Sequence, residues 1–234
     1  MKKLVLISFL FFYAGLIAQD TGDEYQFTPS DYFITQSSFS LPKGVGRYSN
    51  SWILFNDFHY GITNNISAGV GMIPLFFFAG TPSPIWLKVK GAVKVIDYVH
   101  VSGGLSFFTM LGKDVDPTKI NLFGGTLGLT LGNESYNFSV NVYDLFNLNV
   151  EGNVLFYTLS GRARITPRTF LMAEFSDIGE DIEGMFILFG GETLFKNINL
   201  DYGLAYPFAS GEEFLLIPYL GVKLPVGIKK SAKE

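Results

Sequence analysis

The sequence contains no cysteine and few charged residues. Of its 234 residues, 17 are Lys or Arg and 21 are Asp or Glu, so 16% of the chain is charged, against about 25% in an ordinary soluble domain. The absence of cysteine excludes a disulfide framework, a cysteine metal site and a lipid-modified N-terminal cysteine. The low charge leaves too few charged side chains to coat a water-exposed surface.

Long apolar runs are also missing after the first 18 residues. The mean hydropathy is +0.28 and 16% of the residues are aromatic. No later stretch approaches the roughly 18–20 apolar residues of a spanning helix, and the best candidate, Val70 to Gly80, is eleven residues long and contains Pro74. A chain that is too apolar for water and too interrupted for membrane helices is typical of a closed β-barrel in an outer membrane.

The N-terminal residues predict a secretory signal peptide. Met1-Lys2-Lys3 precedes the apolar run Leu4 to Ile17, and Ala18 is the expected cleavage position, so that residues 1–18 are removed. Residues 19–31 then form a short polar lead-in. Losing Lys2 and Lys3 leaves 15 basic against 21 acidic residues, a net charge of −6. That balance lacks the basic footprint of nucleic-acid binding.

From residue 32 the chain divides into runs of about 9–13 residues separated by turn signals. Five short breaks lie at 63–65, 97–98, 132–135, 166–168 and 196–197, and six longer breaks lie near 41–47, 78–84, 111–119, 147–152, 178–183 and 208–213. Alternating short and long breaks are typical of periplasmic turns and outer loops. We therefore predict an all-β fold: a single antiparallel, up-and-down transmembrane β-barrel of about twelve strands over residues 32–225, followed by a basic tail over 226–234.

Side-chain alternation within the runs supports this fold. Between Ile85 and Val95, one face is apolar and the other carries Lys88, Lys90 and Lys94. Elsewhere the polar faces are mostly Gly, Ser, Thr and Asn, and a solvated exterior would carry dense Lys and Glu. This favours a membrane barrel over the alternative, a soluble barrel with its apolar face inward. Two runs break the pattern because they are apolar on both faces: Met185–Phe189 and Phe214–Ile217.

Aromatic residues near the predicted strand ends fit the girdles that form at membrane interfaces. The residues expected there are Tyr60, Tyr98, Tyr136, Tyr206, Trp52 and Trp86.

The segments Ser38–Gly44, Tyr48–Asn50 and Tyr60–Gly71 resemble uncharacterised outer-membrane β-barrel proteins of Gram-negative bacteria, and the resemblance covers residues 1–75. It implies a location in the bacterial outer membrane, with outer-membrane lipid and the export and barrel-assembly machinery as partners, and it transfers no activity. Many such barrels end on an aromatic residue that the assembly machinery reads, whereas this chain ends Gly227–Glu234. We expect either that the last strand stops near Leu224 before the basic tail, or that insertion uses another signal.

Charged residues at inward positions are the candidate site. They are the basic residues Lys88, Lys90, Lys94, Arg162, Arg164 and Lys223 and the acidic residues Asp57, Glu174, Glu192 and Asp201. We expect Glu192 to lie opposite Asp201, which would raise one carboxyl pKa unless a cation sits between them, and Arg162 to pair with Glu174. The lysine row of 88–94 should face small residues near 66–71, 100–106 and 124–130. Charges of one sign select the opposite ion.

These residues predict a narrow channel or transport component for small polar or anionic solutes. One alternative is a closed structural or surface-interaction barrel without transport. Another is an outer-membrane lipid hydrolase or acyltransferase that uses His100 with Ser102 or Ser106. Both histidines, His59 and His100, are expected at the periplasmic end, whereas such enzymes work near the outer leaflet. We therefore predict no enzyme, and two histidines without a third ligand predict no metal or cofactor.

Overall fold

The computed structural model describes residues 31–112, 121–147, 152–177, 184–195, 198–208 and 215–226. The predicted signal peptide (1–18), the lead-in up to residue 30 and the tail beyond Val226 lie outside these residues, as does most of each long loop after residue 112. Those predictions therefore remain expectations.

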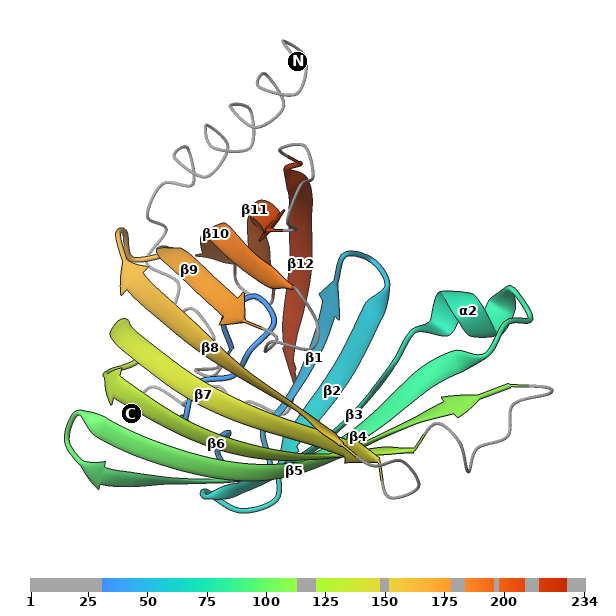
Figure 1. Cartoon of the computed structure of the whole chain (residues 1–234). Helices are drawn as coiled ribbons and strands as arrows, with labels where there is room; N and C mark the ends of the chain where they lie inside the picture. The colour runs from blue at the N-terminus through green and yellow to red at the C-terminus, as the bar shows by residue number, and fades with distance from the viewer. Residues whose placement is uncertain are drawn as a thin grey trace, which may run out of the picture.

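Twelve antiparallel strands form a closed barrel, which confirms the predicted fold class (Figure 1). Neighbours in the chain are neighbours in the sheet, and β1 pairs with β12, where Gly46 lies opposite Val226. The strands are β1(Gly46–Ser51), β2(Phe55–Gly61), β3(Ile66–Met72), β4(Ser83–Ile96), β5(Val99–Leu111), β6(Leu122–Gly132), β7(Tyr136–Asn147), β8(Asn153–Arg164), β9(Thr169–Asp177), β10(Met185–Leu194), β11(Asn199–Phe208) and β12(Ile217–Val226).

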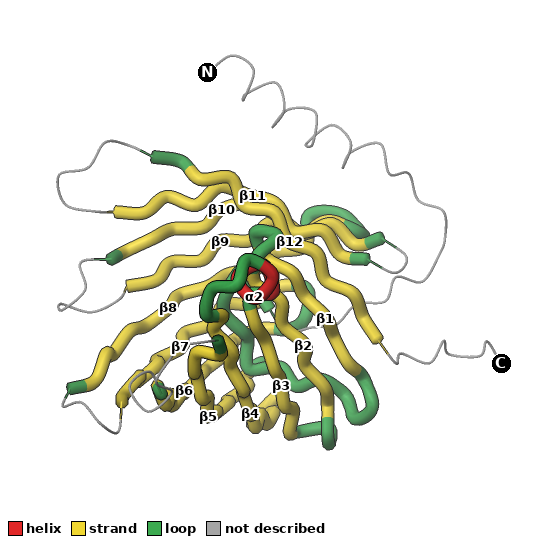
Figure 2. The backbone as a smooth tube through the Cα atoms, turned by 90° about the vertical axis from the view of Figure 1, so that its right-hand side faces the viewer, coloured by secondary structure: helices red, strands yellow, loops and turns green. Residues whose placement is uncertain are grey.

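A single turn of helix, α2(Pro74–Phe78), lies between β3 and β4 at the end of the barrel that carries the long loops. Figure 2 views the molecule from that side, with the strands running around the position of α2. None of the helical residues in the described part of the chain forms a segment long and apolar enough to cross a bilayer.

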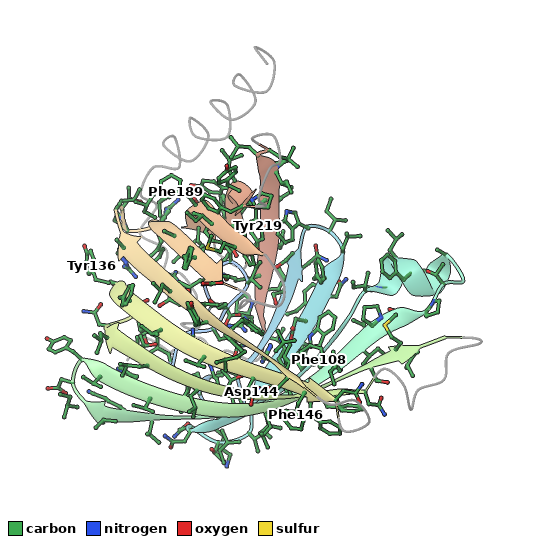
Figure 3. All side chains as sticks on the ribbon, in the orientation of Figure 1. Phe108, Tyr136, Asp144, Phe146, Phe189 and Tyr219 are labelled. Carbon is green, nitrogen blue, oxygen red and sulfur yellow. The ribbon has the colours of Figure 1, made fainter. Side chains whose placement is uncertain are left out.

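The outer face of the barrel is apolar and the inner face is polar. Leu87, Leu105 and Leu127 are 51%, 73% and 70% exposed on the outside. Their chain neighbours Lys88 and Ser106 face inward, where they lie opposite each other across β4 and β5. Figure 3 shows side chains leaving the wall on both faces. A soluble barrel has the reverse arrangement, so the distribution fits a wall that faces hydrocarbon.

The aromatic girdle is present at the short-turn end but includes neither Trp52 nor Trp86, which both line the interior cavity. Tyr60, Tyr98 and Tyr136 are 45%, 64% and 57% exposed near that end, with Tyr136 labelled in Figure 3. Trp86 was expected at the membrane interface, and this prediction is wrong. Because it shares the strand face of Lys88, it points inward and is buried, and its indole N–H donates to Asp57 at 2.7 Å.

The start of the barrel also differs from the prediction. Residues 32–40 were expected to be a strand, but they lie inside the barrel, and the run 48–62 divides into β1 and β2. The dividing turn uses Trp52 and Ile53 at φ of 51° and 67°. Bulky residues rarely adopt positive φ. Because neither position is a glycine or an asparagine, this turn has no local signal in the sequence. The total of twelve strands is right because these two errors cancel.

The break predicted near 41–47 lies at the short-turn end, where the chain leaves the interior and enters β1. Pro42 passes so close to Gly61 that a Cβ at position 61 would lie 2.1 Å from the Pro42 carbonyl oxygen. The amide of Gly44, at φ 82°, donates to the Gly61 carbonyl at 2.9 Å. Glycine at position 61 therefore lets the N-terminal segment cross the rim of the barrel.

Replacing Leu127 with Arg tests which face of the wall meets lipid. A cation near the middle of the lipid face lowers the free energy of unfolding by about 2–4 kcal/mol, whereas one near the interface costs about 0–1 kcal/mol. We expect the larger loss for Leu127→Arg and the smaller for Ile96→Arg, at the end of β4, in urea titrations from lipid vesicles. Equal stability of Leu127→Arg and the wild type would contradict a lipid-facing exterior.

Candidate functional site

Residues 31–42, which we name the plug, lie within the ring of strands. Tyr32, Ser38 and Leu41 are only 1–2% exposed. In Figure 1 the blue trace of this segment lies inside the barrel, between β9 and β1. The plug begins with a tight loop in which Asp31 bridges to Gln36. It occupies part of the interior that the inward charged residues were expected to line.

Polar side chains of the plug form hydrogen bonds with polar side chains of the wall. The Tyr32 hydroxyl donates to Asn137 at 2.6 Å, and burial raises the pKa of Tyr32, which keeps that donor neutral. The hydroxyl groups of Thr35 and Ser160 lie 2.9 Å apart. Farther along, the Ser38 amide donates to the Thr130 hydroxyl at 2.7 Å, and the Ser38 hydroxyl lies 2.9 Å from that of Ser102. Bonds of this kind replace the water that an open lumen would supply.

Glu174 binds the backbone of the plug. One of its carboxylate oxygens, Oε2, accepts the amides of Phe33, Ile34 and Thr35 at 3.2, 3.2 and 3.3 Å. Successive amides that converge in this way form an anion-binding nest. The predicted pairing of Glu174 with Arg162 is wrong, because Arg162 forms its ion pair with Glu192 and the plug supplies the donors for Glu174.

A second ionic group holds the beginning of the plug. The carboxylate of Asp31 forms a buried ion pair with Arg47 on β1. Burial alone would raise the pKa of the Asp31 carboxyl, but the positive charges of Arg47 and Lys223 outweigh it and hold the pKa below its usual value. Lys223 also donates to the carbonyl oxygens of Asp31 and Tyr32 at 3.4 and 3.1 Å.

The predicted register of the two acids on β10 and β11 is confirmed. Glu192 lies directly opposite Asp201. The cation that such a pair requires is Lys223, whose Nζ lies 2.8 Å from the Asp201 carboxylate and 3.5 Å from that of Glu192. Arg162 supplies the second positive charge through its ion pair with Glu192. All four side chains are buried, so two cations balance two carboxylates within the interior.

Three of the basic residues that were predicted to line the lumen, Lys90, Lys94 and Arg164, lie in different surroundings. Lys90 donates to the carbonyl oxygens of Ser37 and Phe39 at 3.2 and 2.9 Å, so it holds the plug. Lys94 is exposed at the short-turn end, where it pairs with Asp97 at 2.9 Å. The guanidinium of Arg164 lies 4.8 Å from the ring of Phe170. As expected, the lysine row lies beside small residues: Lys88 pairs in register with Gly69 and Ser106, and Lys90 with Ser67 and Gly104.

An apolar contact holds the plug against β9, β10 and β12. The Phe33 ring packs edge-on against Tyr219, with centroids 5.0 Å apart. Phe170, Met172 and Leu188 complete this buried cluster. The plug therefore explains why Met185–Phe189 is apolar on both faces: the inward side packs against the plug and the outward side faces lipid.

A cavity of about 400 Å³ lies on the long-loop side of the plug. Its floor is the stretch from Phe33 to Ser37, and most of its surface is carbon. The charged and aromatic residues that line it are Asp31, Phe33, Trp52, Phe55, Asp57, His59, Trp86, Lys88, Lys90, Phe108, Tyr143, Phe156 and Lys223. Sequence reasoning found the lysines and Asp57 but missed the aromatic lining, although period-two spacing already placed Trp86 and Phe108 on the inward face.

Asp57 organises one wall of this cavity. Its carboxylate accepts the Trp86 indole N–H at 2.7 Å and the Lys88 ammonium at 3.1 Å, and it lies 2.6 Å from His59 Nε2. Gly71 on β3 leaves room for the indole, because a Cβ there would come within 2.2 Å of the Trp86 ring. The wall is therefore a fixed arrangement of a ring, a carboxylate and a cation.

The contacts of the two histidines are structural. His59 lies between Asp57 and the Gln36 side chain, and the ring of His100 packs against Phe39 with centroids 4.6 Å apart. Neither of these contacts pairs an imidazole with a serine hydroxyl, so they give the lipid-hydrolase hypothesis no support. In the described part of the chain, no group of three His, Asp or Glu residues could hold a metal ion.

No protein-family model and no curated protein matches the chain. Among solved structures, the KdgM porin in complex with disordered oligogalacturonate is similar, with a TM-score of 0.53 and 9% identity over 77% of this chain and 96% of that one. The NanC porin gives a TM-score of 0.49 and 12% identity over 76% and 97% of the two chains. At such low identity the similarity concerns the fold.

Replacing Asp31 with Asn tests the ionic anchor of the plug. The variant leaves the buried Arg47 guanidinium without its carboxylate, and breaking a buried pair in this way costs about 3–5 kcal/mol. We expect a loss of that size in the free energy of unfolding at pH 7. Asp97→Asn, which breaks the exposed pair with Lys94, should unfold like the wild type, because surface substitutions of this kind have little effect on stability.

The pH dependence follows from the lowered pKa of Asp31. The stabilisation by Asp31 is complete above the ordinary aspartate pKa of about 3.9 and is lost as the pH falls through the lower folded value. The wild type should lose this part of its stability in acid, and Asp31→Asn should not. An identical acid profile for the two proteins would contradict the assigned anchor.

Proposed function

We propose that this protein is a gated transport barrel of the bacterial outer membrane, exported with a cleaved signal peptide, and that it passes small polar or anionic solutes when the plug moves. The observation that carries the proposal is the way the plug is held. Side-chain hydrogen bonds and ion pairs attach the plug to the wall. Within the described residues, the one β-bridge of the plug joins two of its own residues, Asp31 and Gln36. Such contacts can be exchanged without opening the sheet.

The residues that hold the plug would line the lumen once it has moved. Lys90 and Lys223 would lose their bonds to plug carbonyls, and Glu174 would lose three amides. Lys223 would stay paired with Asp201 and Glu192, whereas Lys90 would join Lys88, which already faces the cavity, in a basic path. A basic path favours anions, which agrees with the solute class expected from the lysine row. The fold of the KdgM porin supports a transport barrel in general, and the basic path supports the solute class.

The filled interior also favours a second candidate, a closed structural or surface-interaction barrel. The ionic group of Glu192, Asp201 and Lys223 and the apolar cluster around Phe33 fill the part of the lumen beside β9 to β12. The two candidates differ in one respect, because only transport requires the plug to move.

A disulfide between the plug and the wall separates the two. The chain has no cysteine, and the hydroxyl groups of Ser38 and Ser102 lie 2.9 Å apart, so the variant Ser38→Cys/Ser102→Cys carries a single defined pair. We expect oxidation to abolish solute-dependent swelling of liposomes that contain this variant, and reduction to restore it at least tenfold. Each single-cysteine variant should be insensitive to the oxidant.

Equal swelling of the oxidised and reduced double variant would overturn gating by the plug. No swelling with the wild type would favour the closed barrel.

A further inference from the structure

The cavity above the plug has the features of a ligand site, because aromatic side chains line several of its walls. Phe55, Trp86, Phe108, Tyr143 and Phe156 come from five different strands. Tyr143 and Phe156 stack with centroids 4.6 Å apart and an interplanar angle of 6°, whereas Phe55 and Trp86 lie 6.4 Å apart at 43°. Aromatic rings arranged around one space favour a flat apolar body.

The rings around this space include one that is firmly fixed. Trp86 is bound through its N–H to Asp57 and lies against the backbone of β3 at Gly71. A ring held on two sides is positioned before a ligand arrives, which reduces the entropy lost on binding.

The ammonium of Lys88, which lies beside the rings, can donate further hydrogen bonds. Lys88 Nζ contacts Asp57 at 3.1 Å, and the Lys88 side chain keeps 33% of its surface exposed, although the residue faces the interior. An ammonium has three N–H donors, and the hydrogen bond to Asp57 occupies one of them. The Asp57 carboxylate is already shared with Trp86 and His59.

The remaining charges of the lining add to this preference. Asp31, the other acid of the lining, is paired with Arg47. Lys223 is balanced by Asp201 and Glu192, so Lys90 is the remaining cation of the lining beside Lys88. The cavity therefore has an apolar body and an electropositive side. Its volume of about 400 Å³ is within the range of small-molecule sites, about 300–1,000 Å³, and suits a molecule of one or two rings.

We propose that this cavity binds small aromatic carboxylates, with the ring between the aromatic side chains and the carboxylate on Lys88. The proposal rests on the transport function above, of which it names the solute class. The plug backbone from Phe33 to Ser37 forms the floor, so a bound solute would touch the segment that must move for its passage.

The chain supplies its own probe for this site. It contains two tryptophans, Trp52 and Trp86, and both line the cavity. We would titrate the purified barrel in detergent with phenylacetate, with neutral 2-phenylethanol and with galacturonate, exciting the tryptophans selectively. We expect saturable quenching by phenylacetate, at least tenfold weaker binding of 2-phenylethanol, and no saturation by galacturonate at the same concentrations.

The variant Lys88→Gln should weaken phenylacetate binding at least tenfold while leaving 2-phenylethanol unchanged. Lys94→Gln, which removes an exposed lysine of the same strand, should bind like the wild type, and Lys88→Arg should retain the preference for the acid. Comparison of boiled and unboiled samples on a gel establishes that each variant is folded. If Lys88→Gln does not fold, titration of the wild type and of Lys88→Arg with the three ligands still tests whether the site prefers the aromatic acid.

Equal affinities for phenylacetate and 2-phenylethanol, or no saturable quenching, would overturn the proposal, and tighter binding of galacturonate would replace it with a site for acidic sugars. Uptake of phenylacetate into liposomes separates this inference from the transport function. Selective binding without uptake would contradict transport alone, whereas uptake without selective binding would contradict the site.

Discussion

The structure depends on the requirement that polar and charged groups inside a closed barrel find partners in a space with little room for water. A carboxylate such as Glu174 is 1% exposed, and an unpaired buried charge is strongly destabilising. The plug meets this requirement, because its backbone amides solvate Glu174 and its carbonyl oxygens solvate Lys90 and Lys223. The plug and the wall therefore form one hydrogen-bonded interior.

The same requirement connects the fold to function. Where the plug covers the wall, its backbone amides and carbonyl oxygens solvate the buried charged side chains. Phe33 adds an apolar contact with Tyr219. The plug does not fill the long-loop side of the barrel, where a cavity remains. The Lys88 ammonium faces this cavity and has N–H groups that can bind a ligand. The plug thus occupies part of the lumen and forms the floor of the cavity.

Much of the architecture follows from the sequence because period-two patterns and turn residues are local signals. They gave the strand alternation, the small residues beside Lys88 and Lys90, and the pairing of Glu192 with Asp201. The plug could not be found in this way, since Thr35–Ser40 is a short run whose partners are distant in the chain. The turn at Trp52 and Ile53 was hidden because tertiary contacts, such as the Trp52 N–H to the Pro218 carbonyl at 2.9 Å, hold an unfavourable φ. The doubly apolar run Met185–Phe189 was the available sign of a buried partner inside.

Amide hydrogen exchange of the wild type in lipid vesicles tests the central claim most directly. If the plug fills the lumen, the amides of Phe33, Ile34 and Thr35 are bound to Glu174 and exchange over hours, like those of the neighbouring strand β9. Exchange of these three amides within seconds, with β9 still protected, would show a lumen without the plug and would contradict the account.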